Sequence, residues 1–247
     1  MAAKPATGPR VAIIRNYSTQ GQWGKDMLNR ICNLVHDAVP GADIKHYQPV
    51  DGGDVPNSPD FDLVILTGGT WDLTEPVLDP WVAKIVDWVQ ETSANCLQTK
   101  VLGICWGHQV VSFAMGGKIL LREGGTLIDV EDIPLTSRGQ EFFGGRDILA
   151  LHKFHKRVVI ERPKSFQPLG ERAEILLSDG GQFLTFQAHP EMTPGIAHQL
   201  FDEGDGTYRS DPTPEGVAKT HKNLDRSHDG EVVFSKAMNW AFEPLAN

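Results

Sequence analysis

The stretch KVLGICWGHQVVSFAMGG, from Lys100 to Gly117, places a cysteine between two glycines where a short apolar run gives way to a helical pattern. Such a run, bounded by glycine, is typical of a buried strand, and the residues from Trp106 onward follow helical spacing. Cys105 is therefore expected to end a strand at a sharp turn into a helix. In an open parallel sheet, ligands bind beyond the carboxyl ends of the strands.

The pattern G-I-C-W-G has the form of a nucleophile elbow, with cysteine where many hydrolases have serine. Side chains at Gly103 and Gly107 are expected to clash with the neighbouring helix and strand, and the turn strains the backbone at the cysteine. The positive end of the following helix favours the thiolate. The alternative is a small buried structural cysteine, which is the commoner role of a free cysteine. The two glycines favour the nucleophile.

The rest of the chain alternates between strand and helix patterns in its first half. Strands are predicted over residues 10–16, 42–48, 61–69 and 100–105, and helices over 23–39, 80–91 and from 106 onward. Shorter runs at 118–121, 126–130, 156–160, 174–178 and 181–187 predict strands and hairpins, and helices follow over 193–204 and 231–245. We therefore expect an α/β fold with an open, mostly parallel central sheet flanked by helices and a small antiparallel β extension.

Length and composition limit the possible classes. No linker divides the chain, so one domain over residues 1–247 is expected, with a loose tail at 1–9 and a polar excursion at 204–230. The net charge of −9 argues against nucleic-acid binding, which requires a basic surface. No apolar run reaches the roughly 18 residues of a membrane helix, and the first ten residues lack a secretory pattern. Three scattered cysteines favour a reducing compartment such as the cytoplasm.

A second stretch, FLTFQAHPEM over residues 183–192, offers a base for the cysteine. Residues 183–188 are predicted to form a strand, and His189 and Glu191 then point to the same side of an extended chain. Pro190 disfavours helix at the preceding histidine. A carboxylate beside an imidazole fixes its tautomer and supports its charge. Together with the elbow, this motif predicts a nucleophile, a base and an orienting acid.

The motifs GICWGHQ, TGGT and QAHPE, in that order, resemble the class I glutamine amidotransferases, also called triad glutaminase domains. The resemblance covers roughly Val11 to Leu200. It implies the flavodoxin-like fold of that family and a Cys-His-Glu triad formed by Cys105, His189 and Glu191.

The resemblance also assigns positions around the substrate. It implies an oxyanion hole formed by the backbone N–H groups of Gly69 and Trp106. The implied substrate contacts are Gly68, Trp71, Gln109 and His155.

The implied reaction is cleavage of a γ-glutamyl amide bond through a cysteinyl thioester, which releases glutamate and either ammonia or an amine. It requires no metal and no organic cofactor. His152 and His155 lie close in the sequence and could together bind a metal ion, but no third ligand motif accompanies them. His152 is therefore expected to be structural.

Several functions remain open. A glutaminase would pass ammonia to a synthase, and because too few residues follow Glu191 to form one, that synthase would be a separate subunit. A stand-alone γ-glutamyl peptidase would act on glutathione-like conjugates, and Thr70 and Trp71 stand where amidotransferases often have a proline after the glycines, which would suit a larger substrate. A binding or regulatory module is disfavoured by the complete triad. A related superfamily with a cysteine elbow but no HPE motif, which handles small aldehydes or acts as chaperones, fits less well.

Overall fold

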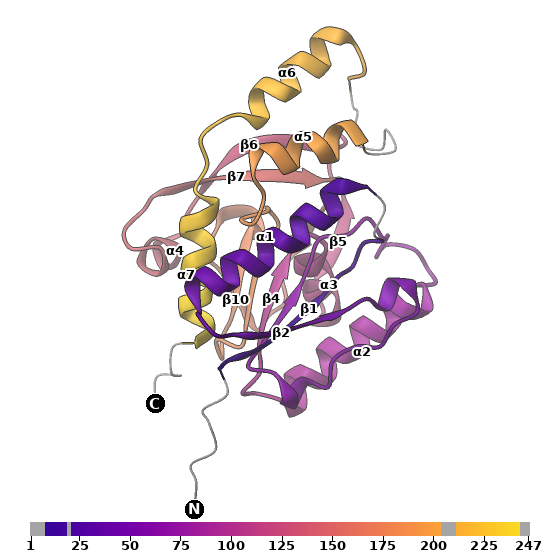
Figure 1. Ribbon diagram of the computed structural model, residues 1–247, viewed down its shortest axis with the longest axis vertical. Coiled ribbons are helices and arrows are strands. Elements are labelled where there is room, and N and C mark those ends of the chain that lie inside the picture. Colours follow the sequence, from indigo (N-terminus) through magenta and orange to yellow (C-terminus); the bar gives the residue numbers. More distant parts are fainter. Residues whose placement is uncertain (1–7, 19–20, 204–210, 243–247) are drawn as a thin grey trace, which may run out of the picture.

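A seven-stranded sheet forms the centre of the computed structural model, which describes residues 8–18, 21–203 and 211–242. The strand order is β2-β1-β3-β4-β11-β10-β9 (Figure 1). The first five strands in this order are parallel to one another, and β10 and β9 extend the sheet antiparallel. The strands are β1 (Arg10–Ile14), β2 (Asp43–Tyr47), β3 (Leu63–Leu66), β4 (Lys100–Ile104), β9 (Phe166–Pro168), β10 (Ile175–Ser178) and β11 (Phe183–Phe186). The predicted α/β class with a mostly parallel sheet is confirmed.

The central strands are apolar on both faces, which explains why helices cover both sides of the sheet. Every residue of β3 and β4 is buried. Val11 and Ile13 of β1 belong to one apolar cluster. Ala12 and Ile14, which point the opposite way, belong to another. Parallel strands of this kind are stable only between two helical layers.

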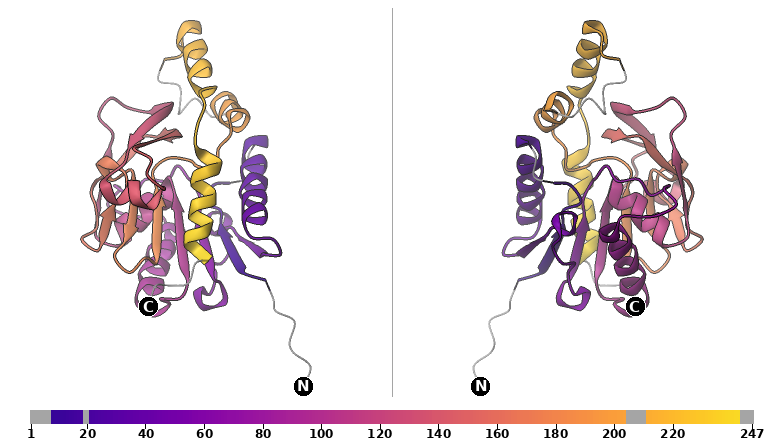
Figure 2. Two further views of the ribbon diagram at one scale, coloured as in Figure 1. Left: turned by 90° about the vertical axis from the view of Figure 1, so that its left-hand side faces the viewer. Right: turned by 90° about the vertical axis from the view of Figure 1, so that its right-hand side faces the viewer.

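The helices divide between these two clusters. Those that pack into the first are α1 (Gln22–Ala38), α5 (Pro194–Glu203) and α7 (Gly230–Phe242), and those that pack into the second are α2 (Pro80–Asn95) and α3 (Trp106–Ala114). Figure 2 shows α1 and α7 on the same side of the sheet. Within the described residues, no helix has the length and apolar character needed to span a bilayer.

Two antiparallel strand pairs form the small β extension that the sequence predicts. They are β5 (Lys118–Leu121) with β8 (Arg157–Glu161), and β6 (Leu127–Pro134) with β7 (Ile148–His155). The sequence analysis does not predict β7, because a lysine and two histidines interrupt its apolar pattern. Lys153 is nevertheless buried, since its ammonium group lies 3.1 Å from a carboxylate oxygen of Glu131 and 2.8 Å from one of Glu174.

The remaining elements are short or peripheral. They are η1 (Pro49–Asp51), η2 (Ser58–Asp60), α4 (Ser137–Phe142), η3 (Glu171–Ala173) and α6 (Pro214–Leu224). Of the polar excursion predicted at 204–230, residues 204–210 lie outside the described part, and the rest contains α6 and the turn into α7. Residues 1–7 of the predicted tail also lie outside it. In Figure 1, α6 projects at the end of the molecule beyond α5.

Strands β1 and β3 end earlier than the sequence predicts, and their ends position the site. The predicted strands over 10–16 and 61–69 stop at Ile14 and Leu66. Beyond them, the N–H of Asn16 donates to Oγ1 of Thr67 at 3.0 Å, and the Asn16 side-chain amide donates to the Thr67 carbonyl oxygen at 2.9 Å. The chain passes from β1 to β2 on one side and then to β3 on the other side of β1, so the strand order reverses at β1. The loops after β1 and β3 therefore border the switch point of the sheet, where ligands bind.

Candidate active site

Cys105 occupies a strained turn between β4 and α3. Its φ of 52° lies in the left-handed region, which is costly for a residue with a side chain. A Cβ on Gly107 would lie 2.3 Å from the carbonyl oxygen of Leu66, and one on Gly103 would lie 2.8 Å from the backbone of Gly107. Both glycines therefore allow the strand and the helix to approach each other, as the sequence analysis expects.

The thiol of Cys105 is buried among polar groups. Its Sγ lies 3.5 Å from the carbonyl oxygen of Phe154 and 3.9 Å from the side-chain amide nitrogen of Gln187. Gln187 in turn accepts a hydrogen bond of 3.0 Å from the amide of Gln109. Sequence analysis does not select Gln187, although it stands two residues before His189, on the same side of an extended chain.

His189 and Glu191 follow β11 and are held against β7. The N–H of His189 donates to the carbonyl oxygen of His152 at 2.9 Å. Its Nδ1 lies 2.8 Å from Oε1 of Glu191, and both side chains are buried. With Nδ1 engaged, Nε2 is the ring nitrogen left for Cys105, whose sulfur lies near enough to raise the pKa of the imidazole.

The charge of Glu191 controls the protonation of His189. Burial alone would lower the pKa of the imidazole, but the carboxylate of Glu191 and the sulfur of Cys105 outweigh burial and raise this pKa to about 10. His189 is therefore an imidazolium at neutral pH. The three residues selected from the sequence thus meet in one place.

The loop after β3 lies against this group. A Cβ on Gly68 would lie 3.0 Å from Cε1 of His189, and one on Gly69 would lie 2.7 Å from the carbonyl oxygen of Asn16. Trp106 is the first residue of α3, so its backbone N–H has no acceptor within its own helix. The two residues expected to form an oxyanion hole therefore lie beside the thiol, and the donor role of their N–H groups remains a prediction.

A wide pocket of about 380 Å³ opens on one side of the thiol. Its walls come from the loop after β1, the start of α1, the loop after β3 and the end of α5, and they are mostly apolar and aromatic. The side chains around it include Tyr17, Trp23, Met27, Trp71, Phe154, His189, Glu191, Leu200 and Glu203.

A narrow pocket of about 20 Å³ meets the wide one at Cys105 and is lined by Gln109, His155, Lys156 and Arg157. Burial, together with the charge of a nearby lysine, lowers the pKa of His155 to about 3, so its ring is neutral. Its Nδ1 lies 3.1 Å from the carbonyl oxygen of Arg157 and therefore carries the donated proton. The buried Nε2 meets no partner among the described residues and is left as an acceptor.

Trp71 lines both pockets. Its indole N–H donates to the carbonyl oxygen of Asn16 at 3.2 Å, and its ring packs edge-on against Trp81 with 5.2 Å between centroids. Its own carbonyl oxygen accepts from the indole N–H of Trp106 at 2.9 Å. Trp71 is therefore a fixed wall of the site.

Sequence analysis does not select Tyr17, Trp23, Leu200 or Glu203, because none of them belongs to a motif. They come from three separate elements that only the fold brings together. The one available signal is topological: the loop after the first strand of a doubly wound sheet usually borders the ligand site.

This fold and site have relatives among known proteins. Residues 44–204 match the family model "Glutamine amidotransferase class-I". The chain is 34% identical over 240 residues to Glutamine amidotransferase-like protein chry6 of Gibberella zeae, covering 96% of this chain and 97% of that protein. It is 27% identical over 199 residues to Gamma-glutamyl peptidase 4 of Arabidopsis thaliana, covering 76% of each.

A glutamine amidotransferase of Thermotoga maritima has the same fold, with a TM-score of 0.70 at 16% identity over 96% of this chain and 99% of that one. The family match and the fungal relative span most of the sequence, including the elbow and the HPE motif. The chain belongs to the class I glutamine amidotransferase family.

Proposed function

We propose that this protein is a thiol-dependent hydrolase that cleaves γ-glutamyl amide bonds. Cys105 is the nucleophile, His189 is the acid and base, and Glu191 holds the imidazole. The observation that carries the proposal is the buried His189–Glu191 pair beside the thiol of Cys105, at the point where the two pockets meet. The family and its γ-glutamyl peptidase members support the choice of bond.

The first half-reaction forms a thioester. An imidazolium at His189 stabilises a thiolate on Cys105, and the thiolate attacks the γ-carbonyl carbon. The backbone N–H groups of Gly69 and Trp106 hold the oxyanion, each contributing about 3 kcal/mol if it acts like a comparable donor. As the C–N bond breaks, His189 gives its proton to the leaving nitrogen.

The second half-reaction regenerates the thiol. His189, now neutral, accepts a proton from water, and the resulting hydroxide equivalent attacks the thioester carbon. The C–S bond breaks, glutamate is released, and the proton on His189 again balances the thiolate. Glu191 supports the imidazolium in both steps because it is buried against Nδ1.

The narrow pocket suits the γ-glutamyl end of the substrate. Nε2 of His155 is an acceptor for an α-ammonium group, and Lys156 offers positive charge to an α-carboxylate, whereas the guanidinium of Arg157 is paired with Asp72. A volume of about 20 Å³ holds about one water molecule, so the two basic side chains must move to admit the substrate.

The wide pocket suits the leaving group. His189 lines this pocket and not the narrow one, so the proton donor faces the side on which the amine departs. On the same measure of volume, a molecule the size of ammonia or water needs only about 10–15 Å³, whereas this pocket measures about 380 Å³. The difference favours leaving amines larger than ammonia.

A second candidate is a glutaminase that supplies ammonia to a separate synthase subunit. The family match favours it, since glutamine amidotransferases are defined by that transfer. In that case the free protein should be slow on glutamine and accelerate when the synthase binds.

The deciding experiment measures glutamate released from glutamine, glutathione and a γ-glutamyl arylamide by purified protein, with Cys105→Ala as control. Fast release from an amide larger than glutamine supports the hydrolase. Release from glutamine alone, accelerated by a partner found in a pull-down, supports the glutaminase. Because the nucleophile must stay reduced and all three cysteines are free, we also propose a cytoplasmic location.

A further inference from the structure

The wide pocket has a carboxylate at its outer end, and its described lining residues include no lysine or arginine. We infer that it selects γ-glutamyl amides whose leaving amine has an apolar body and no carboxylate group. This inference rests on the function proposed above, because it takes the wide pocket as the leaving-group side. It adds the chemical class of the amine.

The inner surface of the pocket is suited to an apolar group. The rings of Tyr17 and Trp23 lie 5.1 Å apart at an interplanar angle of 43°, and Met27 and Leu200 complete this surface. Aromatic and aliphatic side chains of this kind bind a ligand by removing its apolar area from water. A leaving amine with an aromatic or branched body would be held here.

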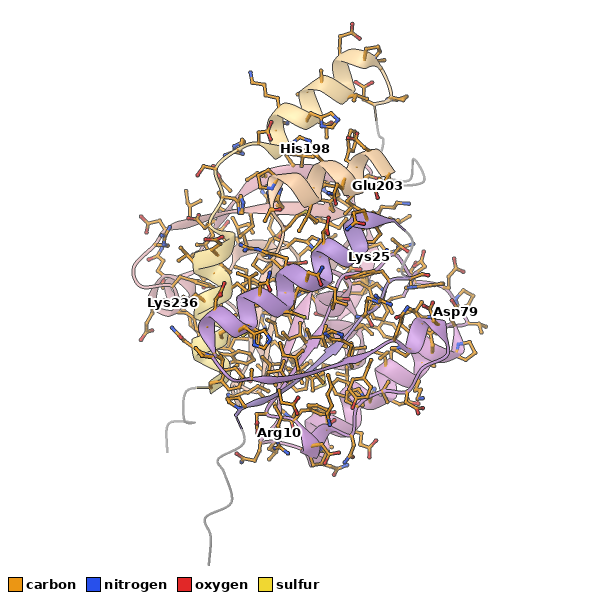
Figure 3. All side chains as sticks on the ribbon, in the orientation of Figure 1. Arg10, Lys25, Asp79, His198, Glu203 and Lys236 are labelled. Carbon is orange, nitrogen blue, oxygen red and sulfur yellow. The ribbon has the colours of Figure 1, made fainter. Side chains whose placement is uncertain are left out.

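The outer end of the pocket is negative. Glu203, the last residue of α5, lines it and faces the start of α1 (Figure 3). Its Oε2 accepts a hydrogen bond of 3.1 Å from the backbone N–H of Gln22. A helix N-terminus is where a substrate carboxylate would otherwise bind. Glu203 therefore occupies that anion position and adds its own charge.

No lysine or arginine lines the wide pocket within the part of the chain that the structure describes. His189 is positive, but the carboxylate of Glu191 balances it. The guanidinium of Arg15 lies over the ring of Tyr17, 5.7 Å from its centroid, yet Arg15 is buried and does not line the pocket. The narrow pocket, by contrast, is lined by a lysine and by an arginine whose guanidinium is paired with Asp72.

An amino-acid leaving group carries a carboxylate on the carbon next to the scissile nitrogen, and a peptide leaving group carries one at its C-terminus. In the wide pocket that carboxylate would lose water, meet apolar rings and approach Glu203, and the described residues that line the pocket offer no lysine or arginine to pair with it. An amine with the same body and no carboxylate avoids all three costs. The cleaved bond is the same in both cases, so the difference lies in binding on the leaving side.

The test compares γ-glutamyl-phenethylamide with γ-glutamyl-phenylalanine, which share an aromatic body and differ by one carboxylate. At low ionic strength we expect kcat/KM to be at least about tenfold higher for the phenethylamide. Glu203→Gln keeps an acceptor for the Gln22 N–H and removes the charge, so it should narrow this ratio about threefold or more. Glu91→Gln, which removes an exposed charge from α2, should leave the ratio unchanged.

Salt gives an independent readout. About 0.5 M NaCl should reduce the ratio of the two kcat/KM values, phenethylamide over γ-glutamyl-phenylalanine, in the wild-type protein. It should have little effect on this ratio in Glu203→Gln. Equal or faster cleavage of γ-glutamyl-phenylalanine, or a ratio that Glu203→Gln does not move, would overturn the inference and leave the proposed hydrolase standing. If neither amide is cleaved in a Cys105-dependent way, both fail.

Discussion

The Nδ1 of His189 lies 2.8 Å from Oε1 of Glu191, and the pair is shielded from water. Burial opposes the charge, but this contact and the nearby sulfur of Cys105 outweigh burial and raise the pKa of His189 from its usual 6.5 to about 10. Because the folded-state pKa is the higher one, the contact stabilises the fold fully below pH 6.5, and this stabilisation is lost as pH rises through about 10. The wild-type melting temperature should therefore exceed that of Glu191→Gln by a margin that shrinks between these values. A margin that stays constant with pH would contradict this account.

Cys105 is expected to be the one cysteine that turnover requires. Cys105→Ala should reduce kcat about 10³-fold or more, whereas Cys32→Ala and Cys96→Ala should stay within a few-fold of wild type. An electrophilic glutamine analogue, followed by peptide mass spectrometry, should label Cys105 alone. Equal labelling of all three thiols would show that no site-specific activation exists.

Substitutions at His189 and Glu191 should reduce the activity by different factors. His189→Ala should cost nearly as much activity as the loss of the nucleophile, since members of such a group act as a unit. Glu191→Gln keeps a hydrogen-bonding group but removes the charge, and its loss of kcat should be about 100-fold smaller. Steady-state rates on one γ-glutamyl amide decide the order. A Glu191→Gln enzyme as inactive as His189→Ala would require another role for the carboxylate.

Gly107 is expected to be a strict requirement of the fold. In Gly107→Ala the new methyl group would stand 2.3 Å from the carbonyl oxygen of Leu66, so the variant should lose about 3 kcal/mol in the free energy of unfolding. The matched control is Gly195→Ala in α5, where nothing lies within 4 Å of the added carbon. That control should be neutral or stabilising by up to about 1 kcal/mol. Urea titrations of both variants measure the difference.

His155 should act on binding rather than on the chemical step. His155→Leu removes the acceptor Nε2 and should raise KM for a γ-glutamyl amide about 10- to 100-fold, the effect of losing a hydrogen bond to a charged group. The kcat should change only a few-fold. His36→Leu, at an exposed position on α1, serves as the control. A fall in kcat without a rise in KM would place His155 outside the substrate pocket.

The sequence predicts those features of this protein that depend on local pattern. The run before Cys105 and the apolar periodicity of the first helices identify the sheet and its helical layers, because burial on both faces leaves a continuous apolar signature. The elbow and the HPE motif point to Cys105, His189 and Glu191 because each motif is a short local pattern, and the fold brings the two motifs together.

Other features depend on tertiary partners and leave no such signature. β7 escapes prediction because Lys153 is buried only through carboxylates supplied by Glu131 and Glu174, which are distant in the sequence. The wide pocket escapes it because Tyr17 and Glu203 belong to different elements that meet only in the folded chain. Propensity and periodicity describe neighbours along the chain, and both features are made by neighbours in space.

The left-handed backbone at Cys105 has an evolutionary consequence. Strain of this kind costs on the order of 1–3 kcal/mol, which is a sizeable fraction of the stability of an ordinary domain. On the proposed mechanism the reactivity of the thiol offsets that cost, since glycine would adopt the same φ without penalty. A descendant that gave up catalysis would therefore be released from cysteine here and drift towards glycine. In related proteins, cysteine at this turn would therefore indicate selection for catalysis, and glycine would indicate selection for stability of the fold alone.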